Sequence, residues 1–208
     1  MELLRQLFGP SKKEIWRLLS ERIGGEFIDG GWFGKDQVVV CHKEWTIILD
    51  TYVVHTNNTH IRFTRMRAPY INKDGFRFTV FRRTFFSDIA TFFGAEDIET
   101  GTDEEFDYDF IIKGNDDYKL WKFFSNERIR TIIKMLPQVK ITVNRATTDA
   151  FINPYPKNVD QLEFKVRGVM KDLEQLQLLF DLFAEMLDHL CHIGAAYEDD
   201  PTLKNYYS

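Results

Sequence analysis

The apolar positions between residues 12 and 23 recur at helical spacing, which predicts an amphipathic helix. Ser11 followed by Glu14 matches the capping box, in which the two side chains satisfy free amides at a helix start. Gly24 and Gly25 supply a stop signal, because glycine adopts the left-handed conformation that ends many helices. The sequence therefore predicts a helix over about 12–23.

The hydrophobic period changes to two between residues 26 and 83. Segments rich in β-branched and aromatic residues predict strands there, at 38–40, 45–49, 61–66 and 76–81. The asparagines within 55–59 and the Asp74-Gly75 pair favour reversals of the chain. The simplest topology is an antiparallel meander in which residues 60–83 form a hairpin, followed by a short helix over about 85–93.

The second half of the chain changes rhythm again. It predicts a strand at 107–113, a helix through about 117–136, strands at 139–143 and 162–166, and a long helix at 170–192. The predicted fold class is α+β, with a mainly antiparallel sheet covered by helices and a long C-terminal amphipathic helix. We expect either a single domain over 1–208 or two fused subdomains, a helix plus β-meander at 11–94 and a β-α-β-β-α unit at 106–193.

The long C-terminal helix carries apolar residues on more than one face. Its main apolar stripe has helical spacing, but Leu178 and Leu182 interrupt the polar face. These two leucines predict a second contact surface, formed either with the N-terminal segment of the chain or with another subunit.

Composition narrows the class of protein. Aromatic residues make up 15% of the chain, which excludes disorder because so much apolar ring area offsets the entropy of ordering. No run approaches the length of a membrane-spanning helix, and the first residues lack the pattern of a signal peptide. Cys41 and Cys191 form no CxxC pair and are expected to be buried thiols. These features predict a soluble cytoplasmic protein without membrane insertion.

The glycine-rich segment 30–36 invites comparison with a phosphate-binding loop. It has three residues between Gly30 and Gly34, where the phosphate loop has four, and Asp36 stands where Ser or Thr is required. A hairpin or bulge loop is the better interpretation. Three aromatic residues near charged loops remain as candidates for a functional contact: Trp32, Phe33 and Tyr70.

The last helix contains acidic and histidine residues at three- and four-residue spacings. Glu185, His189 and His192 are therefore weak candidates for metal ligands, but zinc needs three or four ligands held by further contacts, and no HExxH pattern is present. Cys191 and His192 point about 100° apart on the helix, so they do not form a catalytic dyad. The sequence predicts no catalytic residue, no metal and no cofactor.

Charge is segregated along the chain. Residues 60–83 contain seven bases against one acid, and residues 96–109 contain eight acids and no base. In one interpretation the acidic segment folds over the basic hairpin and neutralises it. In a second the hairpin binds nucleic acid, and in a third it is a surface for a protein partner, where arginine and aromatic residues are enriched. The seven bases are Arg62, Arg65, Arg67, Lys73, Arg77, Arg82 and Arg83.

The segment from Phe106 to Phe110, with the Gly114-Asn115-Asp116 turn after it, resembles an FDxxF…GND motif in an uncharacterised bacterial family of unknown function. The resemblance spans roughly residues 60–135 and implies a bacterial origin and a shared domain. From the residues themselves, Phe106 and Phe110 are expected to share one face of a strand with Tyr108, and Asp116 to cap the following helix.

These features favour a non-enzymatic protein-binding or scaffolding module that binds a protein partner or associates with itself. The alternative from another class is nucleic-acid binding through the basic aromatic hairpin at 60–83. A weaker alternative is a metal-dependent hydrolase that uses the C-terminal histidines.

Overall fold

The computed structural model of the chain describes residues 9–31, 35–55, 59–84, 103–147 and 155–201. Its helices are α2 (Lys12–Ile23), α3 (Glu104–Asp109), α4 (Asp117–Phe124), α5 (Glu127–Met135) and α6 (Leu173–His192). Its strands are β1 (Glu26–Ile28), β2 (Gln37–His42), β3 (Trp45–His55), β4 (His60–Asn72), β5 (Phe78–Arg82), β6 (Phe110–Gly114), β7 (Lys140–Arg145), β8 (Val159–Arg167) and β9 (Ala196–Tyr197). The predicted α+β class, with a mainly antiparallel sheet and a long C-terminal helix, is confirmed.

The strands form one antiparallel sheet in the order β1-β2-β3-β4-β8-β7-β5-β6, with β9 paired to β4. Strands β2, β3 and β4 form the first part of the predicted meander, and β1, which was not predicted as a strand, pairs with β2. The predicted 60–83 hairpin is wrong. Strand β8 pairs with β4 on the side where β5 was expected, and β5 pairs instead with β6 and β7. Long-range pairing therefore overrides the local turn signal at Asp74-Gly75.

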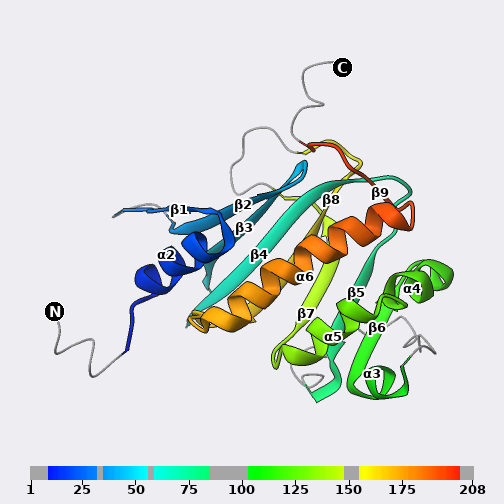
Figure 1. The fold of residues 1–208 in the computed structure, drawn as a ribbon, viewed down its shortest axis with the longest axis horizontal. Helices are drawn as coiled ribbons and strands as arrows, with labels where there is room; N and C mark the ends of the chain where they lie inside the picture. The colour runs from blue at the N-terminus through cyan, green and yellow to red at the C-terminus, as the bar shows by residue number, and fades with distance from the viewer. Residues whose placement is uncertain (1–8, 32–34, 56–58, 85–102, 148–154, 202–208) are drawn as a thin grey trace.

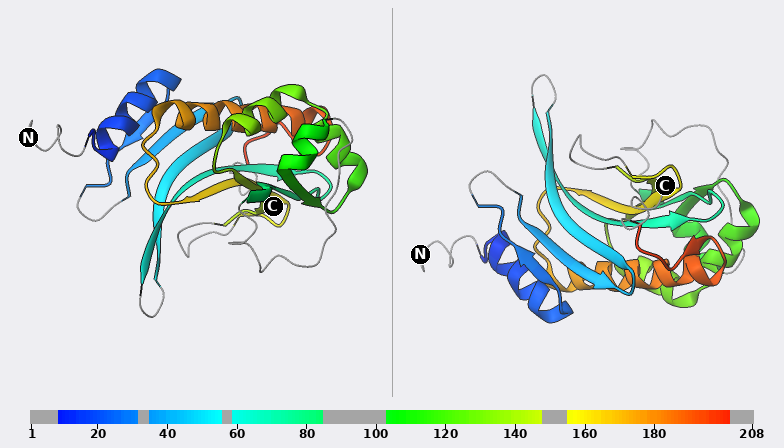
Figure 2. Two further views of the ribbon diagram at one scale, coloured as in Figure 1. Left: turned by 90° about the horizontal axis from the view of Figure 1, so that it is seen from below. Right: turned by 90° about the horizontal axis from the view of Figure 1, so that it is seen from above.

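The helices lie on one side of the sheet (Figure 1). Helix α6 crosses that face diagonally, α2 lies beside its N-terminal part, and α5 lies beside it nearer the centre. The far ends of β3 and β4 bend away from the helices and project from the body of the molecule (Figure 2). A two-stranded arm therefore extends past the covered part of the sheet, next to the start of α2.

The core lies between the helices and the sheet, and aromatic rings fill much of it. Phe78 contacts the rings of Phe76, Phe123 and Phe124, with centroids 4.8–5.5 Å apart. The fully buried aromatic residues include Trp16, Trp45, Phe106, Phe110, Phe164 and Phe183. Most of the aromatic residues in the described part of the chain are therefore core, as the pattern of positions indicated.

The FDxxF segment differs from its predicted form. Residues Glu104–Asp109 form the short helix α3, and the strand begins only at Phe110. Phe106 and Phe110 still stack, with centroids 4.7 Å apart, but Tyr108 does not share their face and is 78% exposed. Asp103 is the N-cap of this helix, because its carboxylate accepts a hydrogen bond from the Phe106 amide. This cap favours a helix where a strand was predicted.

Local capping also divides the helix predicted over 117–136. Asp116 caps α4, as predicted, through the Lys119 amide. Asn126 then caps α5 through the Ile129 amide, so the chain turns between two short helices. The short helix predicted over 85–93 lies outside the described residues.

The second contact surface predicted on α6 is confirmed as an intramolecular one. Leu182 is fully buried in the core, and Leu178 packs against it.

The two cysteines differ from each other: Cys41 is exposed, contrary to expectation, and burial raises the pKa of the half-buried Cys191 thiol. None of the helices in the described part of the chain is long and apolar enough to span a membrane.

Candidate functional site

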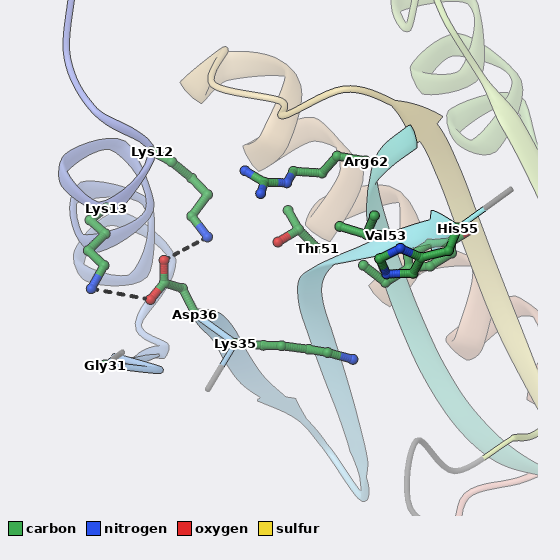
Figure 3. Close-up of a pocket in the computed structure, with 10 residues that line it drawn as sticks. Lys12, Lys13, Gly31, Lys35, Asp36, Thr51, Val53, His55 and Arg62 are labelled. Carbon is green, nitrogen blue, oxygen red and sulfur yellow. Dashed lines mark ion pairs between the residues drawn. The ribbon is translucent and has the colours of Figure 1, made fainter. Parts of the chain in front are cut away.

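A pocket of about 440 Å³ lies where the start of α2 faces the projecting arm of β3 and β4. Figure 3 shows its side chains arriving from opposite sides. Its residues come from segments far apart in the sequence: Lys12, Lys13, Gly31, Lys35, Asp36, Thr51, Tyr52, Val53, His55 and Arg62. We call this set the cationic pocket.

The first turn of α2 supplies two of the lysines. The capping box of Ser11 and Glu14 is present as predicted, which sets where the helix starts and hence where Lys12 and Lys13 emerge. Trp16, one turn further on, is fully buried, and the Lys12 ammonium lies 4.8 Å from the centre of its ring. The helix is thus anchored by its core face while its N-terminal lysines line the pocket.

Two aspartates hold these lysines in place. Asp36 is 8% exposed and binds the Lys12 ammonium at 2.6 Å, while its other oxygen accepts the Gly30 amide at 3.2 Å. Burial disfavours the charge of Asp36, but the hydrogen bonds from Lys12 and Gly30 outweigh it and keep the Asp36 pKa below its usual range. Asp29, just outside the lining, accepts hydrogen bonds from Lys13 and Arg17.

The β3–β4 arm forms the opposite wall. Successive strand residues alternate between faces, so Thr51, Val53 and His55 of β3 share one face with Arg62 of β4. In Figure 3 the Arg62 guanidinium and the Thr51 hydroxyl point toward the Lys12 side, and Lys35 extends toward the arm. At the end of the arm, the Nδ1 atoms of His55 and His60 are 2.6 Å apart.

The pocket concentrates positive charge in an acidic protein. Its lining holds four cationic side chains and one carboxylate, which gives a formal charge of +3 with His55 neutral, whereas the whole chain carries −5. Such a local excess attracts anions, because like charges placed around a concave surface reinforce one another.

The pKa shifts of the pocket show what kind of chemistry it suits. The hydrogen bond to Asp29 raises the pKa of Lys13, and the same bond from Lys13 lowers the pKa of Asp29. The pKa of Asp36 is also lowered. Each of these shifts moves a pKa further from pH 7, so each group stays charged at that pH. Groups that exchange protons during catalysis need pKa values near the working pH. The shifted groups therefore act as fixed charges, which suits binding of an anion.

We expect Asp36→Asn to lower the free energy of unfolding by about 1 kcal/mol at pH 7, because Lys12 loses its charged partner. A carboxylate with a lowered folded-state pKa contributes stability above its unfolded pKa of about 3.9 and loses it as the pH falls through the folded value. Urea unfolding at pH 7 and pH 3 should therefore show a difference between wild type and variant that shrinks in acid. A difference that is constant with pH would contradict the ion-pair interpretation.

The seven bases predicted as a binding surface do not lie together. Only Arg62 lines the cationic pocket. Arg65 and Arg67 are buried and bind Asp50. The remaining four have other contacts: Arg77 with Asp160, Arg82 with Asp109, Arg83 with the carbonyls of Asp107 and Tyr108, and Lys73 with the ring of Tyr197.

The acidic segment is described only from Asp103 onward, so the predicted cover over 60–83 is observed in part. Asp109 binds Arg82 at 3.1 Å, which agrees with mutual neutralisation. Asp103 and Glu105 instead bind Lys134 of α5. These acids therefore stabilise the junction of α3 and α5 as well as part of the basic segment.

The aromatic and metal candidates have other surroundings, although the rings of His189 and His192 stack with centroids 5.5 Å apart. Trp32 and Phe33 lie outside the described residues, and Tyr70 is fully buried, so it presents no ring at the surface. Glu185 binds Asn126 and Arg128, and a ring nitrogen of His189 lies 3.1 Å from the Lys122 carbonyl. Within the described ranges, no group of three His, Cys, Asp or Glu side chains is arranged to hold a metal ion.

Sequence reasoning missed Lys12, Lys13 and Lys35 as site residues. Lys12 and Lys13 follow the capping residue, and Lys35 lies in the glycine-rich segment that was assigned to a hairpin loop. That hairpin is confirmed by the pairing of β1 with β2. No local pattern links 12, 35 and 62, because their meeting depends on where α2 packs against the sheet.

Comparisons with known proteins found no matching family model, no match among curated proteins and no match among solved structures. Membership of the bacterial family that the FDxxF…GND motif resembles stays a prediction. The function of the cationic pocket is therefore inferred from its geometry and charge.

Proposed function

We propose that the protein is a non-enzymatic binding module that recognises an acidic group of a protein partner through the cationic pocket. The observation that carries this proposal is that Lys12, Lys35 and Arg62, from three separate segments, line one pocket. Charge complementarity of this kind gives specificity and speeds encounter, because opposite potentials steer the partners together.

The surroundings of the pocket favour a protein partner. Val53 lines the pocket and is 36% exposed. Apolar side chains next to a charged pocket provide contacts for the residues that flank an acidic group in a polypeptide. A nucleic acid would instead need several basic and aromatic side chains along an extended surface, and the bases of 60–83 are dispersed among Asp50, Asp109 and Asp160.

The experiment compares a double charge reversal in the pocket with a single charge reversal outside it. Lys35→Glu combined with Arg62→Glu reverses two charges of the pocket at exposed positions, and Lys157→Glu reverses an exposed charge outside it. A fluorescent glutamate-rich peptide is titrated at low salt and followed by anisotropy. We expect the double variant to weaken binding by about tenfold or more, since each reversal costs on the order of 1 kcal/mol at an exposed site.

The control variant should bind the peptide as the wild type does. Lys157→Glu changes the net charge half as much as the double variant does. A loss of binding free energy in Lys157→Glu that is half that of the double variant, or larger, would show that only overall charge matters, and the proposal would fail. It would also fail if the wild type preferred a single-stranded oligonucleotide of equal charge over the peptide.

A further inference from the structure

We propose that the group bound in the cationic pocket is a phosphoryl monoester, carried by a phosphorylated side chain of the partner protein. This inference rests on the proposed function and names its ligand. Three observations support it: the charge of the lining, the directions from which its donors arrive, and the size and apolar part of the pocket.

Charge favours a dianion over a carboxylate. The lining carries a formal charge of +3 with His55 neutral, and its one carboxylate, Asp36, is already held by Lys12, Lys13 and the Gly30 amide. A phosphorylated side chain carries about −1.5 to −2 at pH 7 and a glutamate carries −1. Because Coulomb energy scales with the product of the charges, the phosphoryl group gains up to about twice as much from the same pocket.

The directions of the donors favour a tetrahedral group. Lys12 comes from α2, Lys35 from the segment before β2, Thr51 from β3 and Arg62 from β4. In Figure 3 Lys12, Thr51 and Arg62 point toward one another from different elements, and Lys35 extends along the other side of the pocket toward the β3–β4 arm. A phosphoryl group presents three acceptor oxygens in different directions and matches the fork of an arginine guanidinium. A carboxylate presents two oxygens in one plane, so it would engage fewer of these donors at once.

The size of the pocket favours a phosphorylated side chain over a free ion. Its volume of about 440 Å³ falls in the range of roughly 300–1,000 Å³ that is typical of small-ligand pockets. Val53 adds apolar surface to the charged lining. A phosphorylated residue uses both parts, because its phosphoryl group reaches the lysines while its carbon atoms and neighbouring residues contact the β3–β4 arm.

The test uses three peptides of one sequence that differ at the central residue, which is phosphoserine, glutamate or serine. Each is titrated into the wild-type protein by isothermal calorimetry. We expect the phosphoserine peptide to bind about tenfold more tightly than the glutamate peptide, and the serine peptide to show no binding, since a tenfold change corresponds to about 1.4 kcal/mol.

Two conservative variants separate a shaped phosphoryl site from a diffuse positive charge. Arg62→Lys keeps the charge but removes the guanidinium fork, and Thr51→Val keeps the shape but removes the hydroxyl. We expect Thr51→Val to weaken binding of the phosphoserine peptide by about fivefold or more while changing binding of the glutamate peptide by less than about twofold, because the third phosphoryl oxygen loses its donor. Arg62→Lys should weaken binding of both peptides, because the guanidinium fork also matches a carboxylate. Lys157→Glu again serves as the control.

The outcomes distinguish this inference from the proposed function. Equal affinity for the phosphoserine and glutamate peptides would overturn the phosphoryl inference and leave the acidic-partner proposal standing. Absence of binding by both peptides would overturn both. Inorganic phosphate that binds as tightly as the phosphoserine peptide, or phosphatidylcholine vesicles containing a phosphoinositide that bind more tightly than it, would overturn the assignment of the phosphoryl group to a protein side chain.

Discussion

Replacing Asp50 with alanine should lower the free energy of unfolding by about 3–5 kcal/mol, because it removes the carboxylate that two buried arginines share. Asp50 is fully buried. Arg65 donates to both of its oxygens, at 2.9 and 2.7 Å, and Arg67 donates at 3.0 Å. The two arginines are only 7% and 8% exposed, so water cannot replace the lost partner without a rearrangement of the sheet. Urea unfolding followed by circular dichroism measures the loss.

Alanine substitutions at two other aspartates provide a comparison for the stability cost of Asp50→Ala. Asp160 is also buried, but its partner Arg77 has a side chain that is 46% exposed and can be hydrated when the carboxylate is removed. We therefore expect Asp160→Ala to cost less than Asp50→Ala, and Asp181→Ala at an exposed position of α6 to cost less than about 0.5 kcal/mol. A cost for Asp50→Ala that is no larger than that for Asp160→Ala would contradict the role assigned to burial.

Replacing Trp16 with alanine should also cost about 3–5 kcal/mol, as is typical of large aromatic residues in a core. Trp16 is fully buried, and its indole N–H donates to the Met170 carbonyl at 3.2 Å, which ties α2 to the segment before α6. The same ring lies beneath the Lys12 ammonium. The variant should therefore lose binding of the anionic peptide along with stability, because α2 carries one wall of the cationic pocket.

Two variants of the same helix separate these effects. Trp16→Phe keeps most of the ring and loses the hydrogen bond, so we expect a cost of about 1–2 kcal/mol with peptide binding retained. Leu18 is 45% exposed on the opposite side of the helix, and Leu18→Ala should change stability by less than about 0.5 kcal/mol. A large cost at Leu18, or none at Trp16, would show that the buried face of α2 was assigned incorrectly.

The candidate site was less predictable than the fold. Arg62 was included among the predicted binding residues, and it does line the pocket. Arg65 and Arg67 belong to the same charged run, yet they point to the opposite face and are neutralised by Asp50 from the neighbouring strand. Charge counted along the sequence does not distinguish these cases, because alternation along a strand sends neighbouring bases to different faces.

The sequence by itself determined the elements whose signals are local. Helix α2 occupies the predicted range of 12–23, and α6 begins within a few residues of its predicted start. Capping boxes, N-caps and helical periodicity depend on residues three or four apart, so their energies are present before the chain folds. The period of two likewise identified the paired strands β2, β3 and β4.

Only the tertiary structure decided the strand order and the pocket. Strand β8 lies beside β4 although about ninety residues separate them, and this pairing places β5 on the far side of β7. The meeting of Lys12, Lys35 and Arg62 likewise depends on how α2 packs against the sheet. Contacts of this kind are selected by burial of the whole core rather than by any short segment, because each side chain gains from packing only when its distant partners are in place.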